Sequence, residues 1–489
     1  MRRFQTKRIT DPVHGSIGIS DLEAKVIGSK SFQRLRHVKQ LGLAHYVFPG
    51  ADHSRFAHSL GACHVTLRLL EAIRNSDCGV PIDDDEIQLY RLAALLHDVG
   101  HYPFSHAMEE AVASHYSAGV FHQKTRNPKR SKKSDQEDGQ VEFYNHERLG
   151  KQILLNDPEI ADVLIKAKIE PKTLSSVIRR ERPPKFANLI SSDLDADRID
   201  YLLRDAHQSG LPYGDVDLDY LLSQARLDKD SRICFTRKAS RTIDHFLLSR
   251  YFSYQQISYH KTVAAFEMVL KKVIATLLRH EILDCSDRSI DKAVGEGSWC
   301  QFDDQNVFQK IRELEKFGRK ISPEETIEAS CIIARAAPKL LGEIEFLDKR
   351  QSAVKKDFYH MKQSIVEKLP MWSKDFKINS NLWYVWGPSV ITLTKIGSHV
   401  PVSFVQTEDD IDKAEQSVRI LNPHNNTSET ISSLGHSLMH ILSDYALYSL
   451  RVYALLSESQ IKHRHKIAAR IQSDLPHLRW TNQQPNRKV

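Results

Sequence analysis

The sequence contains no run of apolar residues long enough to cross a membrane. A helical span needs about 18–20 consecutive apolar residues, and no stretch of the 489 residues approaches that length. The first residues are basic, but no apolar segment follows them, so the N-terminus lacks the features of a secretory signal. We therefore expect a cytoplasmic protein with no membrane partner.

Cysteine is scarce, and the sequence has no internal repeat. The six cysteines are scattered, and no Cys-x-x-Cys pair occurs among them. This spacing suits reduced cytosolic thiols better than a disulfide framework or a zinc ribbon. The net charge of +7 is modest for the length, so it permits anionic partners such as nucleotides without requiring them.

Histidine, in contrast, is abundant, with 24 residues, many of them in the first 150 positions. That region also has mostly helical spacing. We expect a mainly α fold, with a helical core over residues 1–280 and a smaller α+β region over residues 281–489. The second region has room for a regulatory or oligomerising surface.

The pattern along the chain is mostly helical, with recognisable punctuation. Residues 11–20 predict a turn or short hairpin, and Asp83, Asp84 or Asp85 is expected to cap the helix that runs to His97. The polar stretch at about 122–141 is basic and then acidic, which predicts a surface insertion. Further on, the sequence predicts a helical lobe over 281–350, strands over 381–406 and helix again over 427–457.

The pair His97 and Asp98 stands at the end of an unbroken apolar run, 92–96. Ionisable side chains that leave a dry interior are costly unless they are paired, hydrogen-bonded or bound to metal. With His58 upstream and Asp197 downstream they form a candidate ligand set. Imidazole and carboxylate ligands together suit Fe, Mn, Co, Ni or Zn better than Ca. Each histidine alone could equally be an ordinary core or surface residue.

Asp197, Tyr201 and Asp205 follow one another at intervals of four residues, so they share one face of a helix. One carboxylate could bind metal, the ring could pack on a sugar or base, and the last carboxylate could accept a hydrogen bond from a hydroxyl. The alternative is a solvated acidic face, with these carboxylates and their neighbours Asp195 and Asp200 paired to arginines at 198 and 204.

Candidates for acid–base chemistry follow the His97-Asp98 pair directly. They are His101, His106 and Glu109, and His146 lies beyond the polar insertion. Histidine titrates near neutrality and can protonate a leaving group there. These side chains approach one cleft only if the helix resumes after Pro103, and otherwise they are surface residues.

Taken together, these motifs resemble a known family. The series DPVHG (11–15), RFAHSLG (55–61), LLHDVGHYPFSH (95–106), NHE (145–147) and DLDADRIDYLLRDA (193–206) is similar to that of the HD-domain superfamily. It resembles most closely the deoxynucleoside triphosphate triphosphohydrolases, over residues 7–265. Because the resemblance begins so near residue 1, we expect no additional N-terminal interaction domain.

The resemblance implies a helical HD-domain core and a role for each matching residue. A divalent metal (Mn, Mg, Fe, Co, Ni or Zn) would be held by His58, His97, Asp98 and Asp197. Arg55, Arg198 and Tyr201 would surround the phosphates, His101, Glu109 and His146 would act at the scissile bond, and His106 would support the attacking water. Gln40 and Asp205 would contact the sugar 3′-hydroxyl, and Arg250, Tyr254 and Lys261 would close the pocket. Water would attack the α-phosphorus and release nucleoside and inorganic triphosphate.

Two positions depart from the pattern of the family. Ser258 stands where relatives usually carry a tyrosine that helps exclude a ribose 2′-hydroxyl, which puts the choice of deoxy over ribo substrates in doubt, although Tyr259 could substitute. Gln33 and Arg36 match a regulatory nucleotide site, but Gly28 replaces an acidic residue that reads guanine in some relatives. The resemblance also implies a homo-oligomer, a tetramer or hexamer, and a role in draining nucleotide pools, including antiviral defence.

Two other functions remain open on the sequence. One is an HD-family phosphohydrolase or phosphodiesterase that acts on a monophosphate, an alarmone or a cyclic dinucleotide, with His101 and His106 as ligands of a second metal. The other is nucleic-acid binding through the basic residues of 124–133 and the later cluster Lys462, Arg464, Lys466 and Arg470. Such binding would weaken steeply with salt.

Overall fold

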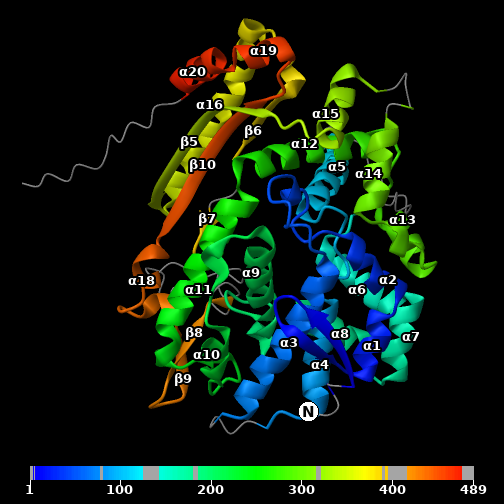
Figure 1. The fold of residues 1–489 in the computed structure, drawn as a ribbon, viewed down its shortest axis with the longest axis vertical. Coiled ribbons are helices and arrows are strands. Elements are labelled where there is room, and N and C mark those ends of the chain that lie inside the picture. The colour runs from blue at the N-terminus through cyan, green and yellow to red at the C-terminus, as the bar shows by residue number, and fades with distance from the viewer. Residues whose placement is uncertain are drawn as a thin grey trace, which may run out of the picture. The chain divides into compact units, whose positions relative to one another are not determined.

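The computed structural model describes Phe4 and residues 6–76, 81–124, 143–179, 185–314, 316, 321–387, 391–394 and 416–475. Two compact units divide the chain, one built from Met1–Arg335 and Leu393–Asp444, the other from Ala336–Thr392 and Tyr445–Val489. The fold is mainly helical with small sheets (Figure 1), which confirms the predicted fold class. The division predicted at residue 280 stays a prediction. Among the described residues, no helix is both long and apolar enough to cross a membrane.

The first unit begins with the predicted hairpin. Strand β1 (Lys7–Asp11) pairs antiparallel with β2 (Gly15–Ile19). Helix α1 (Asp21–Ile27) follows, held at its start by a capping box between Ser20 and Glu23. Helix α2 (Lys30–Gln33) and two 3₁₀ turns, Arg34–His37 and Ala44–Tyr46, lead to the central helices.

Helix α3 (Arg55–Arg74) is the central element, and it packs on both α4 (Asp84–Leu96) and α9 (Ala196–Ser209). Because it is covered on several sides, its apolar residues are not confined to one stripe. Asp83 caps α4 through a capping box with Glu86, as predicted. Helix α4 ends at Leu96, so the chain leaves the buried helix at His97 and Asp98.

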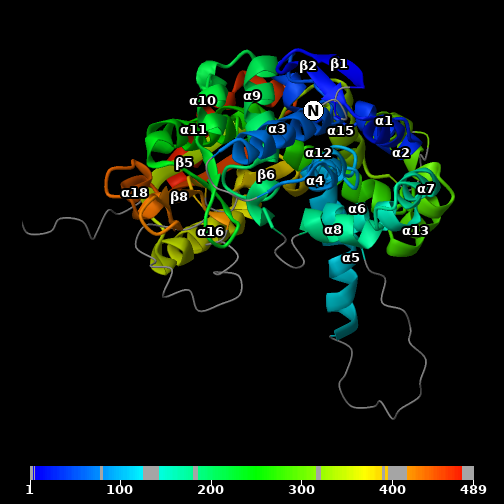
Figure 2. The same ribbon diagram turned by 90° about the horizontal axis from the view of Figure 1, so that it is seen from below.

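Further helices surround this centre. They are α5 (His106–Lys124), α6 (His146–Asn156), α7 (Pro158–Lys166), α8 (Pro171–Arg179), α10 (Leu218–Ser223), α11 (Ser240–Ser253), a π-helical turn (Tyr254–Ser258), α12 (Lys261–Arg279), α13 (Asp287–Gly295), α14 (Asp304–Glu313), α15 (Pro323–Ile333) and α18 (Met439–Leu442). Helix α5, which points downward in Figure 2, begins at His106 and confirms that the helix resumes after Pro103. The insertion predicted at about 122–141 lies outside the described residues, apart from residues 122–124 at the end of α5.

A small sheet completes the first unit. Its strands β3 (Ala225–Leu227), β4 (Ile233–Phe235), β8 (Arg419–Asn422) and β9 (Thr427–Thr430) lie in that order. Strand β4 pairs with β8 in parallel, through Phe235 and Ile420, and the other pairs are antiparallel. Strands β8 and β9, which are far from β3 and β4 in sequence, are thus held in the first unit by main-chain hydrogen bonds.

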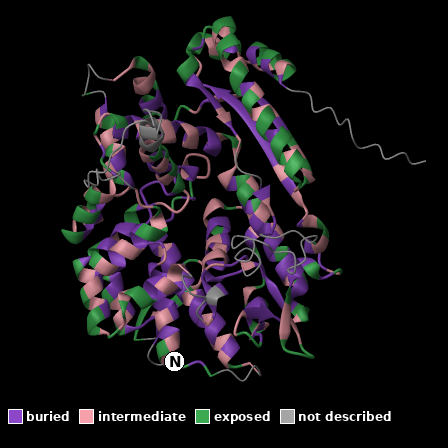
Figure 3. Cartoon of the chain, turned by 180° about the vertical axis from the view of Figure 1, so that it is seen from behind, coloured by how far each residue is buried: buried purple, intermediate pink, exposed green. Residues whose placement is uncertain are grey.

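The second unit is a sheet covered by helices. The order β5 (Lys339–Lys349), β10 (Tyr445–Ala454), β6 (Trp383–Trp386) is antiparallel throughout, and β7 (Ile391–Thr392) also pairs with β10. Helices α16 (Ser352–Phe376), α19 (Glu458–Lys462) and α20 (Arg464–Asp474) complete it. Ile365 and Trp372 of α16 share one apolar cluster with Tyr448 and Leu450 of β10. Figure 3 shows β10 largely buried.

Two predictions for the second half of the chain were wrong. Residues 339–349, expected in a helical lobe, form β5. Within 427–457, expected as helix, residues 427–430 form β9 and residues 445–454 form β10. In β10, Ala446, Tyr448, Leu450 and Val452 enter the cluster at every second position, which is the period of a strand. The strands predicted within 381–406 are confirmed as β6 and β7, and residues 395–406 lie outside the described chain.

Candidate active site

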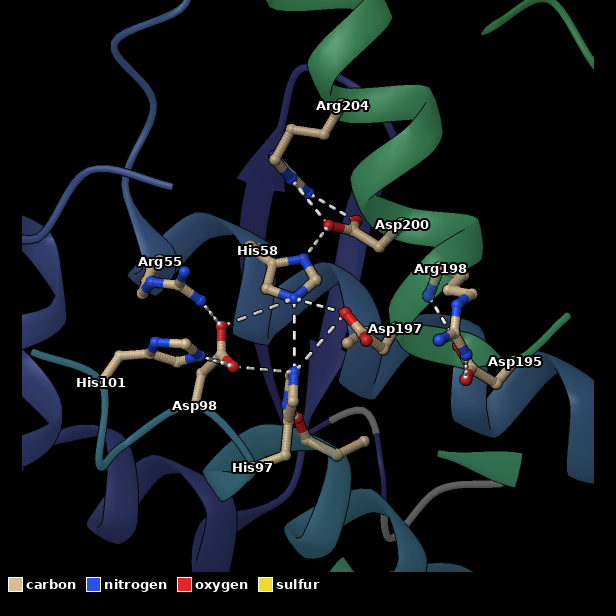
Figure 4. Close-up of polar contacts among 12 residues, drawn as sticks. Arg55, His58, His97, Asp98, His101, Asp195, Asp197, Arg198, Asp200 and Arg204 are labelled. Atoms are coloured by element: carbon tan, nitrogen blue, oxygen red, sulfur yellow. Dashed lines mark hydrogen bonds and ion pairs between the residues drawn. The ribbon is translucent and has the colours of Figure 1, made fainter. Parts of the chain in front are cut away.

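Three elements bring the predicted metal ligands together. Helix α3 carries His58, the end of α4 presents His97 and Asp98, and the first turn of α9 presents Asp197 (Figure 4). His58 Nε2 lies 3.0 Å from Asp197 Oδ1, and His97 Nε2 lies 3.6 Å from the same oxygen. His97 Nε2 is also 3.2 Å from Asp98 Oδ1. Ligand atoms of His58, His97 and Asp197 all lie within 4.8 Å of one another.

Hydrogen bonds on the far side of each ring fix which nitrogen faces the centre. His58 Nδ1 lies 2.8 Å from Asp200 Oδ2, and His97 Nδ1 lies 2.8 Å from the carbonyl oxygen of Ala94. Both acceptors require a proton on Nδ1, so both Nε2 lone pairs face each other at 3.4 Å. Two such lone pairs repel unless a cation lies between them. This buried donor set is therefore consistent with binding of a divalent metal.

Without a metal, protons provide the positive charge. Burial lowers the pKa of His58, but the hydrogen bonds to Asp197 and Asp200 outweigh it and raise that pKa to about 10. Burial raises the pKa of Asp197, whereas its contacts with His58 and His97 lower it further than burial raises it. Without metal, a protonated His58 thus faces an ionised Asp197. A divalent cation bound there would replace the proton on the imidazole nitrogen that faces the centre.

Asp98 is held ionised by cations on its other side. Arg55 Nη1 donates to Asp98 Oδ2 at 2.5 Å, and His101 Nε2 lies 3.2 Å from Oδ1. Burial raises the pKa of Asp98, but the charges of Arg55 and His97 and the hydrogen bond from His101 hold it well below its usual range. Burial and the charge of Arg55 together keep the pKa of His101 well below its usual value, so this ring is neutral.

A buried ion network behind His58 was not predicted. Asp200 accepts from Arg204 Nε at 2.9 Å, and His14 Nε2 lies 2.7 Å from its other oxygen. Arg204 Nη1 continues to Asp11 Oδ2 at 2.8 Å. The only sequence signal was the spacing of Asp200 and Arg204, which is that of an i,i+4 ion pair.

The alternative reading of this helix as a solvated acidic face was wrong in one respect. Its ion pairs exist, because Arg204 binds Asp200 and Arg198 Nη1 lies 2.9 Å from Asp195 Oδ2. However, Asp195, Asp200 and Asp205 are all buried. Charges that are buried and paired in this way orient other side chains, and they do not form a solvent-facing surface.

The acid–base candidates form a second group beside the first. His146 Nδ1 lies 2.9 Å from Glu109 Oε2, and His106 Nδ1 lies 3.5 Å from the same oxygen. The rings of His101 and His146 stack with their centroids 4.2 Å apart. Burial raises the pKa of Glu109, but the contacts with His106 and His146 outweigh it and lower that pKa. Burial lowers the pKa of His146, and Glu109 outweighs this and raises it.

Most of the predicted substrate contacts line one cavity of about 310 Å³. They are Gln40, Arg55, His106, Arg198, Tyr201, Asp205 and Tyr254, together with His97, Asp98, His101, His146, Asp197 and the divergent Ser258. Of these, Gln40 Oε1, Tyr201 Oη and His101 Nδ1 are buried and have no hydrogen-bond partner within the described chain. A cavity wall with unsatisfied buried polar atoms requires water or a polar ligand.

The structure does not bring every predicted residue to this cavity. Arg250 is buried, and its guanidinium binds Asp193 and the carbonyl oxygen of Leu393. Lys261 begins α12 and is exposed. Gln33 and Arg36, the predicted regulatory pair, bond to each other at 2.8 Å outside the cavity lining.

Comparison with protein families agrees with this geometry. The HD domain model matches residues 55–205, a range that begins with Arg55 and includes all four candidate ligands. The chain carries an HD domain. Over 274 residues it is 35% identical to the uncharacterized protein YwfO of Bacillus subtilis, and this alignment covers 55% of each chain. Over 252 residues it is 31% identical to the mouse deoxynucleoside triphosphate triphosphohydrolase SAMHD1, covering 47% of this chain and 34% of the mouse protein.

Two solved structures share the fold around this HD domain. A hypothetical protein from Aquifex aeolicus has a TM-score of 0.65 at 23% identity, with 94% of this chain and 99% of that chain covered. A phosphohydrolase from Bacteroides thetaiotaomicron has a TM-score of 0.63 at 21% identity, with 92% and 100% covered. By sequence, this chain spans about half the length of the curated relatives it matches. The comparisons therefore assign an HD domain to this chain and show that its fold is shared with these two structures.

Proposed function

We propose that this HD-domain protein is a metal-dependent phosphohydrolase that cleaves deoxynucleoside triphosphates into nucleoside and inorganic triphosphate. One observation carries the proposal, namely that a single cavity is lined by the His/Asp centre, by two arginines and by buried polar atoms without partners. These three features match the metal, the phosphates and the sugar of one nucleotide. The activity named for the mouse relative supports the same substrate class.

The His/Asp centre supplies the electrophilic part of the chemistry. A divalent metal held by His58, His97, Asp98 and Asp197 would stabilise negative charge on the phosphate and activate water. Asp200 and the Ala94 carbonyl keep both imidazoles in the tautomer that such a metal needs. The chain therefore contributes a centre whose ligands are oriented before substrate arrives.

Cationic side chains offset the charge that grows on the phosphates. Arg55 and Arg198 both line the cavity, and each is anchored by a carboxylate, Asp98 for Arg55 and Asp195 for Arg198. Fixed cations stabilise a transition state without the cost of reorganising at the moment of reaction. Tyr201, whose hydroxyl has no partner in the described chain, lies on the same wall.

His101, Glu109 and His146 form the group that would act in general acid–base catalysis. The reaction breaks the bond between the α-phosphorus and the 5′ oxygen, and the departing oxygen needs a proton. Glu109 raises the pKa of His146, which favours the protonated ring, the form that is able to donate. Neutral His101 stacks against His146, and its unpartnered Nδ1 is able to accept a hydrogen bond from water or substrate.

A second candidate function, cleavage of a phosphodiester with two metal ions, is favoured by one observation. Ligand atoms of His106, Glu109 and His146 lie within 4.8 Å of one another, which is close enough to hold a second ion. His106, Glu109 and His146 would then bind the second ion, and His146 would not act as a proton donor. Counting bound metal per chain separates the two candidates, because the first expects one ion and the second expects two.

Regulation and assembly extend the proposal. We propose a homo-oligomer, a tetramer or hexamer, with a nucleotide activator near Gln33 and Arg36. Arg36 lies 3.6 Å from the ring centroid of Phe56, the second residue of α3, so a ligand there would contact the helix that carries His58. Sedimentation with and without nucleotides tests this, and a monomer under both conditions would contradict it.

Product analysis tests the main proposal. Purified protein with Mn²⁺ or Mg²⁺ is given each dNTP and each NTP, alone and in mixtures, beside the double variant His97→Ala with Asp98→Ala. We expect deoxynucleoside and intact triphosphate from the wild type and neither from the variant. Cleavage of ribonucleotides would show that Ser258 relaxes sugar selection. Release of monophosphate or pyrophosphate, or cleavage only of diesters, would contradict the proposal.

A further inference from the structure

His53, a residue with no role predicted from the sequence, contacts one of the cavity-lining carboxylates. Its Nε2 lies 2.9 Å from Asp205 Oδ1, although the two residues are 152 positions apart in sequence. Both side chains are almost completely buried, at 3% and 6% exposure. A buried imidazole that contacts a buried carboxylate fixes the orientation of that carboxylate.

Main-chain pairing fixes where His53 lies. Residues 38–40 run antiparallel to residues 53–55, with Lys39 opposite Ser54. Gln40 N donates to the carbonyl oxygen of His53 at 3.0 Å, and Arg55 N donates to that of Val38 at 2.9 Å. The same short pairing therefore places Gln40, His53 and Arg55 beside one another, at the start of α3.

The surroundings of His53 determine which of its ring nitrogens donates a hydrogen bond. Its Nδ1 is buried and has no hydrogen-bond partner among the residues that the structure describes. A proton on this atom would be a buried donor without an acceptor, which is costly. The geometry therefore makes Nε2 the nitrogen that donates a hydrogen bond, to Asp205 Oδ1.

This single hydrogen bond leaves the second oxygen of Asp205 available. Asp205 lines the cavity, and its Oδ2 accepts no hydrogen bond from a described residue. Gln40 Oε1 lines the same cavity and has no partner there either. A carboxylate that could rotate would spend its time bonding to water, whereas one held at Oδ1 keeps Oδ2 in place for a ligand hydroxyl.

We propose that His53 is a positioning residue, which holds Asp205 so that the site selects substrates with a sugar 3′-hydroxyl. The proposal rests on the proposed function, because it assumes that the cavity binds a nucleotide. His53 does not touch the substrate itself. Replacing His53 should change the recognition of one hydroxyl group only, whereas replacing a residue that only supports the fold should affect all substrates alike.

The test compares two substrates that differ only in that hydroxyl. Triphosphate release is measured as kcat/KM for dATP and for 2′,3′-dideoxy-ATP, in wild type, His53→Leu and His53→Gln. Gln keeps a side-chain amide donor near the place of Nε2, whereas Leu fills similar space without a donor. Asp205→Asn serves as the reference for a weakened acceptor. Bound metal and the melting temperature confirm that each variant is folded.

We expect the wild type to prefer dATP by about 10- to 100-fold, the range of one hydrogen bond to a charged group. His53→Leu should bring this preference close to one by slowing dATP cleavage, and His53→Gln should restore most of it. If the Leu variant does not fold, His53→Met takes its place, because Met also lacks a donor.

Three results would count against the idea. A Leu variant that loses activity on both substrates equally, with the preference unchanged, would show a purely structural role for His53. A wild type that does not distinguish the substrates would overturn the positioning role and leave the proposed function intact. A wild type that cleaves neither substrate would contradict the proposed function, and the inference would fall with it.

Discussion

The two units of the chain bury very different kinds of side chain. The interior around α3, α4 and α9 contains arginines, carboxylates and histidines, among them Arg91, Arg204 and Asp200, all with no exposed surface. The interior of the second unit is an apolar cluster around Ile365, Trp372 and Tyr448. Burying charge costs free energy that burying hydrocarbon does not. In the first unit, this cost accompanies a function of the buried charges, because Asp200 and Arg204 orient the candidate metal ligand His58.

The largest expected effect comes from removing ligands of the charged interior. The double variant His97→Ala with Asp98→Ala should lose bound divalent metal and all measurable phosphohydrolase activity. The loss should exceed the roughly 10- to 100-fold that outer partners of a metal centre carry. Metal content by mass spectrometry and triphosphate release measure it, and a variant that retains its metal would contradict the assigned ligands.

Breaking the network behind the ligands should lower both stability and metal affinity. Arg204→Met leaves Asp200 and Asp11 buried without their partner, which costs about 3–5 kcal/mol in the free energy of unfolding. Because Asp200 orients His58, metal affinity should also fall, by about 10- to 100-fold. Denaturant unfolding and metal titration measure the two effects.

A matched control exists in the same unit. Arg91 is equally buried and pairs with Glu23 at 2.6 Å, but Glu23 contacts no candidate metal ligand. Arg91→Met should therefore destabilise the fold by a similar amount and leave metal affinity unchanged in the protein that remains folded. Equal losses of affinity in both variants would show that the network around Asp200 only supports the fold.

The apolar interior should respond through packing alone. Ile365→Ala removes a fully buried side chain from the cluster, which costs about 2–5 kcal/mol. Ile365→Val, which loses a single methylene, should cost about 0.5–1.5 kcal/mol. Metal affinity should be unchanged in both variants. A shift in metal affinity with Ile365→Ala would show that the two interiors are coupled.

A small, pH-dependent effect is expected from one carboxyl group of α12. Burial raises the pKa of Glu267 to about 7, although Lys271 opposes this, and Glu110 adds to it. Since the unfolded chain gives up that proton near pH 4.5, stability should fall as the pH rises from about 4.5 to 7. Glu267→Gln should remove this slope and stabilise the protein at pH 8 by about 1–2 kcal/mol. Melting temperatures across pH measure it, and an unchanged slope would contradict the shift.

Sequence patterns predicted elements well where local signals are strong. The hairpin at β1 and β2, the cap at Asp83 and the start of α5 after Pro103 depend on residues close together in the chain, and all three are confirmed. Strand β10 was missed although Tyr448, Leu450 and Val452 alternate with Ser449 and Arg451, because so short an alternation stands inside a longer stretch that was read as helix. Pairing with β5 and β6 on both sides made it a strand.

For the site, the sequence by itself determined which residue types are available and at what spacing. The run from Leu92 to Asp98 and the four-residue spacing from Asp197 to Asp205 indicated a metal centre and a shared helix face. The convergence of α3, α4 and α9 decided the rest. His14 and Asp200 are 186 positions apart and His53 and Asp205 are 152 apart. Partners at such separations leave no periodic signal, because burial and hydrogen-bond direction are set only when distant helices pack.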